Sequence, residues 1–195
     1  MNAPMSRDRP RAISLPPESR IAAIYGRVNL ADAYAIHLPP GTARNPEVLA
    51  RFVFAHQPRW ISFLMRIRSA LVAPFGLKTG SGLTSAGAEG SRIGIFKVYE
   101  VNAVEVIMGE DDKHLDFRVS ALYQPPLQAS AGRSRFVLST VVRCHNRLGR
   151  CYIGLIAPFH RLIVRSYLRR AARMGWPREV KGDPATGRSV AGEMR

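Results

Sequence analysis

Acidic side chains are scarce in this sequence, which has 14 Asp and Glu against 29 Lys and Arg and a formal net charge of +15. The excess is uneven, because residues 133–195 hold 14 Lys or Arg and only 3 Asp or Glu, whereas residues 31–132 are close to neutral. Such a basic region attracts phosphate-bearing partners, either nucleic acid or anionic lipid. The alternative is a solvated, arginine-rich surface without a partner.

Long apolar runs are also missing, and none reaches the ~20 residues that cross a bilayer. The longest candidate, residues 151–164, contains His160 and Arg161. Residues 1–19 lack the apolar segment of a secretory signal. These features lead us to expect a cytoplasmic protein.

Cysteine occurs only twice, as Cys144 and Cys151. The two can form a disulfide across a turn, but reduced, partly buried thiols suit a cytoplasmic protein better. No zinc-binding spacing joins them to His145 or His160, so no metal site is predicted.

Nucleotide-binding motifs are absent as well. Residues 77–91 are rich in Gly, Ser and Thr, but Lys78 precedes the glycines and a strand follows them. A P-loop instead ends in Gly-Lys-Ser/Thr and leads into a helix, and no G-x-G-x-x-G fingerprint follows a predicted strand. We interpret the segment as a mobile loop at the mouth of a cavity, and no cofactor is predicted.

The apolar periodicity predicts an α+β protein. A short strand is followed by two helices, the first of which begins at Pro46 after an Asn45 N-cap. Alternating apolar residues then predict an antiparallel meander. The expected segments are strands over 33–38, 95–101, 104–108, 115–123 and 136–144, a second helix over 59–72, and a hairpin turn at 109–112. Residues 1–20 are expected to be a flexible lead-in, 21–173 a single domain, and 174–195 a flexible tail.

A long amphipathic helix is predicted from about Leu148, after an Asn146 N-cap. Pro158 lies inside it, so a kink or a break is expected there. A helical wheel separates a basic stripe from an apolar side. The stripe contains Arg161, Arg165, Arg169 and Arg173, and the apolar side contains Ile153, Ile156, Phe159, Ile163 and Tyr167. We expect the apolar side to cover the inner face of the sheet, and a helix lying on a membrane surface is the alternative.

The densest ionisable cluster contains Asp111, Asp112, His114 and Asp116. A carboxylate beside a histidine can act as an acid–base pair, but aspartate is also favoured in turns for its local hydrogen bonds. Asp116 and Arg118 share a strand face and are expected to pair. No catalytic residue is assigned.

Two further histidines are candidates. His145 is either a base or anion contact, or it caps the turn from sheet to helix. His160 is expected to face the sheet and to form a hydrogen bond there. Cys144 and His145 are adjacent in a strand and point to opposite faces, which argues against a nucleophile–base pair.

Four segments carry a resemblance to a known family. They are ADAYAIHLPPG (31–41), PRWISFLMRIRSALVAPFGLKTG (58–80), GEDDKHLDFRVSALY (109–123) and STVVRCHNRLGRCYIGLIAPFHRLIVRSYLRRA (139–171). The chain resembles the bacterial domain-of-unknown-function family 2867, in a form without the reductase domain that some members carry. That family is similar to the START-related, polyketide cyclase-like (SRPBCC) superfamily. The resemblance implies a helix-grip fold, in which a curved antiparallel sheet wraps around the long C-terminal helix and leaves an apolar cavity.

From this we expect a non-enzymatic module that holds an apolar small molecule or lipid between sheet and helix. The expected cavity residues are Trp60, Phe63, Met108, His114, Phe117, His145, Phe159 and His160. One alternative is an enzyme of cyclase or isomerase type that pairs His114 or His145 with a carboxylate. Another is a peripheral protein whose arginine stripe contacts an anionic membrane. Nucleic acid is the weakest alternative, because the basic residues are not interleaved with aromatic residues on a strand.

Overall fold

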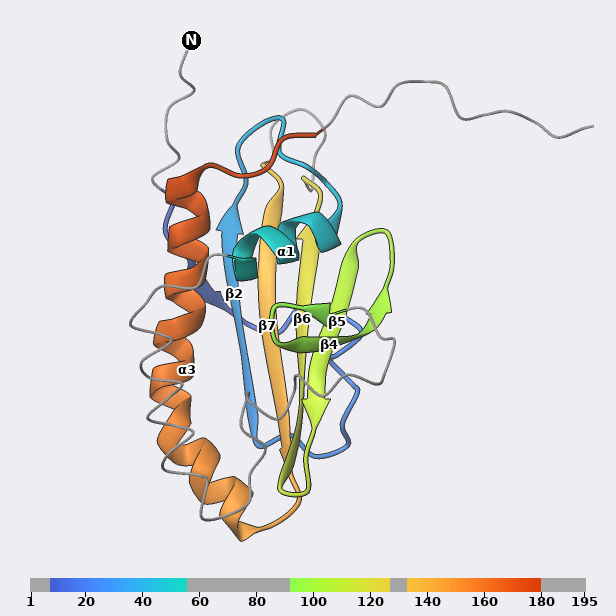
Figure 1. Ribbon diagram of the computed structural model, residues 1–195, viewed down its shortest axis with the longest axis vertical. Coiled ribbons are helices and arrows are strands. Elements are labelled where there is room, and N and C mark those ends of the chain that lie inside the picture. Colours follow the sequence, from blue (N-terminus) through green and yellow to red (C-terminus); the bar gives the residue numbers. More distant parts are fainter. Residues whose placement is uncertain (1–7, 56–91, 127–132, 180–195) are drawn as a thin grey trace, which may run out of the picture.

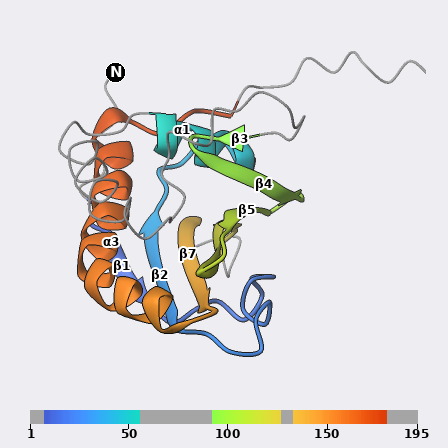
Figure 2. The same cartoon turned by 60° about the horizontal axis from the view of Figure 1, so that its bottom comes forward.

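The computed structural model describes residues 8–55, 92–126 and 133–179 (Figure 1). One antiparallel sheet runs in the order β1-β2-β7-β6-β5-β4-β3. The strands are β1 (Arg11–Ile13), β2 (Leu30–His37), β3 (Arg92–Ile93), β4 (Phe96–Val101), β5 (Glu105–Asp111), β6 (Leu115–Gln124) and β7 (Arg135–Cys144). The described helices are α1 (Pro46–Ala55) and α3 (Arg147–Met174). The predicted α+β class, with a curved antiparallel sheet around a long C-terminal helix, is confirmed (Figure 2).

The meander predicted from period-two alternation runs from β4 to β7, and β2 pairs with β7 along its whole length. The hairpin turn predicted at 109–112 is wrong, because β5 continues to Asp111 and the turn occupies 112–114. Gly109 lies inside β5, where an added Cβ would be 2.1 Å from the carbonyl oxygen of Phe117. This glycine therefore permits a close approach of two strands rather than a turn.

Helix α1 begins as the sequence predicts. The Asn45 Oδ1 atom accepts hydrogen bonds from the backbone N–H groups of Glu47 and Val48, at 2.8 and 3.2 Å. Pro46 fits the first helical position because its missing N–H would have no partner there. The second helix predicted over 59–72 and the glycine-rich loop over 77–91 lie outside the described residues.

The main core lies on the concave face of the sheet, beneath α1 and the C-terminal part of α3. Its fully buried side chains include Phe136, Met108 and Leu168. The ring of Phe54 on α1 contacts Phe96 of the sheet and Tyr167 of α3, with 5.4 Å between centroids in both pairs. These edge-to-face contacts join the three elements.

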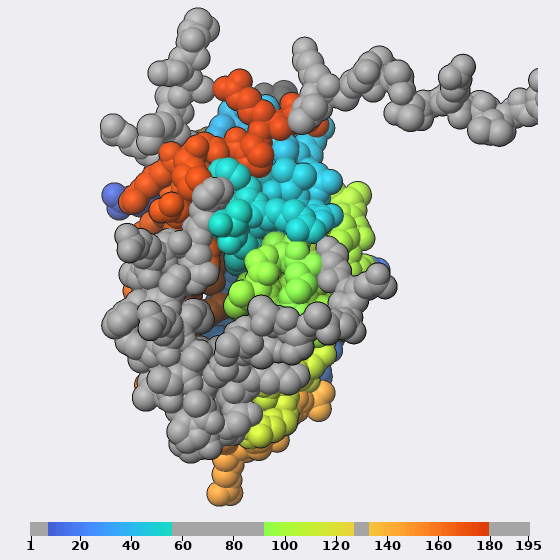
Figure 3. Space-filling model, viewed as in Figure 1, coloured from blue at the N-terminus to red at the C-terminus, as the bar shows by residue number. Residues whose placement is uncertain are grey.

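The described residues after α3, 175–179, also pack against the domain, so the flexible tail expected over 174–195 does not describe them. Gly175 ends the helix with φ of 83°, a conformation that favours glycine. Trp176 is buried and its ring lies 5.7 Å from that of Phe136. The Pro177 carbonyl accepts a hydrogen bond from the N–H of Ala43 at 2.8 Å. Figure 3 shows this red segment in contact with α1 and the loop before it.

The convex face is covered by the N-terminal segment, so the flexible lead-in predicted for residues 1–20 does not describe residues 8–20. β1 pairs with β2 at the edge of the sheet. Ile13 and Leu15 pack on the convex side of β2 and β7, and Ile21 is fully buried there. The polar, proline-rich composition of this segment gives no local sign of order, because its order comes from long-range contacts.

A buried carboxylate holds this segment to the sheet. Glu105 of β5 is 2% exposed. Its side chain accepts hydrogen bonds from Ser19 Oγ (2.6 Å), Ser120 Oγ (2.5 Å) and the N–H of Arg20 (3.1 Å). Three donors compensate for the removal of the carboxylate from water.

Helix α3 follows its predicted N-cap, since Asn146 Oδ1 accepts a hydrogen bond from the N–H of Gly149 at 2.9 Å. The helix is continuous through Pro158, so the predicted break does not occur, and it curves along its length (Figure 1). No helix among the described residues is long and apolar enough to span a membrane.

Candidate functional site

The candidate site is the region where the N-terminal half of α3 faces the concave side of the sheet. At the other end of the helix, Leu168, Ala171 and Ala172 are buried against the core. In the N-terminal half, the inward residues Ile153 and Ile156 are only half-buried. The helix therefore packs tightly at one end and leaves apolar surface partly uncovered at the other.

The sheet presents a row of neighbouring side chains to this part of the helix. Cα pairing places Asp32 of β2 beside Thr140 of β7, Thr140 beside Val119 of β6, and Val119 beside Met108 of β5. Alternate residues of a strand share one face, so these four side chains lie on the concave side. The row is apolar at β5 and β6 and polar at β7 and β2.

A histidine of α3 meets the polar end of this row. His160 Nε2 lies 3.3 Å from Asp32 Oδ1, with side chains 23% and 11% exposed. Arg161 Nε lies 3.9 Å from the other carboxylate oxygen, Asp32 Oδ2, which is buried and accepts no hydrogen bond within the described part of the chain. Among the described residues, one acceptor of the carboxylate therefore has no donor.

Asp32 also influences the adjacent tyrosine on the same face. Burial, together with the negative charge of Asp32, raises the pKa of Tyr34 above its ordinary value of 10.0. Arg161 and Arg165 act in the opposite direction on that pKa. The phenol remains protonated at neutral pH, so this end of the site holds a carboxylate, an imidazole and a hydroxyl. Such a set can bind the polar group of a ligand or move a proton.

Three of the predicted cavity residues belong to this side of the sheet. Met108 is fully buried in the concave core, and the ring of Phe117 packs there 5.8 Å from that of Phe96. His160 faces the sheet and contacts it, as expected. Trp60 and Phe63 lie outside the described residues.

The other predicted cavity residues lie elsewhere. Phe159 is on the outer side of α3 and is 45% exposed. His114 Nδ1 lies 2.9 Å from Asn146 Nδ2 at the start of the helix. His145 Nε2 lies 3.0 Å from Asp116 Oδ2. This last contact connects the turn before α3 to the sheet, in agreement with the capping alternative.

The acidic cluster near the β5–β6 turn is divided among different partners. Asp116 and Arg118 do not pair as predicted, because Arg118 forms an ion pair with Asp111 at 2.7 Å. Its guanidinium also lies over the ring of Tyr99, 3.8 Å from the centroid. The hydrogen bond from Arg118 holds the pKa of Asp111 below its ordinary value, whereas burial and the bond to Asp111 raise the pKa of Tyr99 to about 12. These contacts lie on the convex face, away from His160.

Both cysteines are free thiols, with Cys144 half-buried and Cys151 exposed. Burial raises the pKa of the Cys144 thiol, which lowers its nucleophilic thiolate fraction. Across residues 8–55, 92–126 and 133–179, no three His, Cys, Asp or Glu side chains are placed to hold a metal ion.

A separate depression of about 390 Å³ lies at the end of the sheet, near the β2–α1 loop. It is open to solvent, and its arginines have local partners: Arg44 pairs with Glu179 at 3.5 Å and Arg133 with Asp8 at 2.8 Å. The region around His160 and Asp32 is the better candidate, because there a buried carboxylate oxygen has no donor among residues 8–55, 92–126 and 133–179 and lies beside apolar surface.

Asp32 did not stand out in the sequence, although one signal points to it. It lies two residues before Tyr34 and four before Ile36, so a charged side chain falls on the apolar face of a strand. A buried charge needs a partner, and His160 was the histidine expected to face the sheet.

Comparison with known proteins places the chain in a family. Neither a search of curated proteins nor a search of solved structures gave a match. The family model described as a protein of unknown function, DUF2867, matches residues 24–167. This range begins before β2 and ends within α3, so it includes both Asp32 and His160. The chain belongs to the DUF2867 family.

Proposed function

We propose that the protein binds an apolar small molecule or a lipid between the concave face of the sheet and the N-terminal half of α3. The carrying observation is the His160–Asp32 contact, in which Asp32 Oδ2 is buried and accepts no hydrogen bond from the described residues. A ligand hydroxyl or amide that donates to this oxygen would supply the missing bond. The apolar body of the ligand would cover Ile153 and Ile156.

The physical chemistry of binding sites supports this proposal. Small-molecule sites are mostly apolar and have a few polar groups that fix the orientation of the ligand. The row from Met108 to Asp32 has this composition. The resemblance to the START-related superfamily implies an apolar cavity in the same place.

Binding of the apolar dye Nile red to the full chain tests the proposal. Ile156→Trp places a larger side chain on the inner side of α3, so we expect the affinity for the dye to fall at least about tenfold, since a filled site loses most of its apolar contact area. Leu155→Trp is the matched control on the outer side of the same helix, where the side chain is 62% exposed. We expect this control to leave the affinity unchanged.

Equal effects of the two substitutions would reject the inner site. Thermal unfolding of both variants should be compared with that of the parent protein, because an overpacked variant can lose affinity by unfolding. Asp32→Asn provides a second test, since it changes the polar contact without filling space. It should alter the affinity for ligands that carry a hydroxyl more than the affinity for Nile red.

Proton transfer is a second candidate function, favoured by the same contact. His160 and Asp32 form a histidine–carboxylate pair beside the proposed ligand. The His145–Asp116 pair lies instead at the turn before α3, and His114 contacts Asn146 at the start of that helix. A molecule extracted from His160→Gln protein should change its chromatographic retention when incubated with the parent protein. Unchanged retention would reject catalysis and leave binding in place.

A further inference from the structure

The outer face of α3 exposes apolar side chains that no described element covers. Leu155 is 62% exposed, Phe159 45% and Leu162 51%. Their spacing of four and three residues puts them on one side of the helix, and we name them the outer apolar stripe. Leu168 and Ala171, which are buried against the core, lie on the opposite side. The stripe therefore points away from the sheet.

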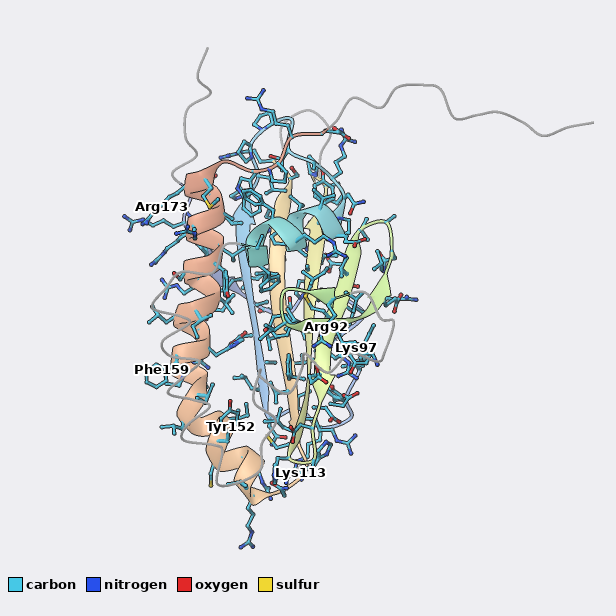
Figure 4. The ribbon with its side chains drawn as sticks, viewed as in Figure 1. Arg92, Lys97, Lys113, Tyr152, Phe159 and Arg173 are labelled. Atoms are coloured by element: carbon cyan, nitrogen blue, oxygen red, sulfur yellow. The ribbon has the colours of Figure 1, made fainter. Side chains whose placement is uncertain are left out.

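One arginine continues the same side of the helix toward its C-terminal end, and another flanks it. On a helical wheel Arg173 falls at the angle of Leu155, whereas Arg165 lies at the edge of this side, about 80° from Leu155. Figure 4 shows Phe159 and Arg173 pointing outward on the same side of α3. Neither Arg165 nor Arg173 has a carboxylate within ion-pair distance in the described ranges.

The charge of the whole helix has one sign. The sequence from Arg147 to Met174 contains no Asp or Glu, and its cationic side chains are Arg147, Arg150, Arg161, Arg165, Arg169, Arg170 and Arg173. An anionic partner would meet no repulsive charge on this element. A partner that also covers the outer apolar stripe would remove these side chains from water, and neighbouring exposed apolar residues are typical of interaction sites.

We propose that the outer face of α3 docks on an anionic phospholipid bilayer. The outer apolar stripe enters the boundary between headgroups and acyl chains, and the arginines contact lipid phosphates. A helix that lies in the interface plane has this combination of an apolar side and flanking basic residues. Leu155 to Arg173 spans about 27 Å along the axis, so the contact extends over several headgroups.

The two parts of the surface together favour a membrane over nucleic acid. Arginines alone are enough to bind the phosphates of a nucleic acid, but the three apolar side chains would then stay exposed to water. The inference goes beyond the proposed ligand site, because that site uses the inner side of α3. The ligand site and the membrane contact can therefore each be rejected without affecting the other.

Cosedimentation of the full chain with vesicles tests this inference. Two compositions are needed: phosphatidylcholine alone, and phosphatidylcholine with about one third phosphatidylglycerol, which supplies a negative surface potential. We expect binding only to the anionic vesicles and a steep decrease of that binding with salt. Leu155→Gln combined with Phe159→Gln should reduce the partition coefficient at least about tenfold, because the inserted apolar area is lost. Each of Arg165→Gln and Arg173→Gln should reduce it about fivefold.

Two exposed residues away from α3 provide matched controls. Val48→Gln removes an apolar side chain on α1 that is 42% exposed, and Arg27→Gln removes an exposed cation from the convex side. Both should leave vesicle binding unchanged. Absent binding to anionic vesicles, or equal losses in the controls and the α3 variants, would overturn the inference. A duplex oligonucleotide is the competitor. If it displaces the protein from the vesicles and binds the Leu155→Gln/Phe159→Gln variant as tightly as the parent protein, the arginines bind nucleic acid instead.

Discussion

Replacement of Glu105 should destabilise the protein far more than replacement of any exposed carboxylate. Glu105 is the common acceptor for the buried hydroxyls of Ser19 and Ser120 and for the N–H of Arg20. Ser19 belongs to the segment on the convex face and Ser120 to β6, so one carboxylate joins the N-terminal segment to the sheet. Removing it affects both layers.

The magnitude follows from the groups left behind. Glu105→Ala leaves two buried hydroxyls without their acceptor, and each unpaired buried group costs about 1–3 kcal/mol. The truncation also leaves a cavity, which adds to the loss. We expect the free energy of unfolding to fall by about 3–5 kcal/mol, close to the cost of breaking a buried charged contact. Glu105→Gln keeps the shape and one acceptor oxygen, so its loss should be about 1–2 kcal/mol.

Urea unfolding followed by circular dichroism measures these differences. Glu100→Ala is the control, because Glu100 forms an exposed ion pair with Arg20 and such pairs contribute about 0–1 kcal/mol. Limited trypsin digestion adds a local readout, since a released segment is cut sooner at Arg11. A loss below about 1 kcal/mol for Glu105→Ala would refute the role of this carboxylate, since that is the scale of an ordinary surface substitution.

Three further outcomes are expected. Gly149→Ala should lower stability by about 1–3 kcal/mol, because its Cβ would meet the carbonyl oxygen of His114 at 2.3 Å. Gly154→Ala in the same helix has open space around the new Cβ and should raise stability by about 0.5–1 kcal/mol. A Gly149→Ala protein that unfolds at a higher temperature than Gly154→Ala would contradict the packing of α3 on the turn. Arg118 lowers the pKa of Asp111 in the folded state, so the contribution of this ion pair to stability is complete above the ordinary pKa of 3.8 and is lost as the pH falls through the folded pKa. Below about pH 4, the free energy of unfolding of Asp111→Asn, measured by urea titration, should therefore fall less than that of the parent protein. An equal fall in both proteins would count against the pair.

Local signals in the sequence predicted much of the fold. Asn45 and Asn146 cap their helices because an N-cap needs only a short side chain beside the first free N–H groups. The alternation in the sequence of β6 follows from a strand whose two faces have different surroundings. In each case the interaction spans a few residues of the chain, so its pattern is visible without the fold.

Long-range contacts account for the differences. Ser19 gains its partner from a strand 86 residues later, so the N-terminal segment gave no local sign of order. Gly109 is required by the carbonyl of Phe117 across the hairpin, and composition alone suggested a turn. The apolar arc of α3 is wide, so helical periodicity alone places Phe159 on the inner side, whereas the side chain is 45% exposed. Only the packing of Leu168 and the contact of His160 fix the rotation of the helix.

The candidate site was predicted in part for the same reason. His160 was expected to bind the sheet, and it does. Asp32, its partner, comes from the first long strand and lies 128 residues earlier. The antiparallel pairing of β2 with β7 brings β2 beneath α3. Periodicity within each segment cannot predict which strands pair.

Native mass spectrometry of the full chain purified from cells tests the central claim most directly. A ligand held between the sheet and the inner side of α3 should appear as added mass that is released by organic solvent. Ile156→Trp should lose this mass while Leu155→Trp retains it. A parent protein that carries no added mass and binds no Nile red, or an Ile156→Trp variant that keeps the full complement, would contradict the proposed function.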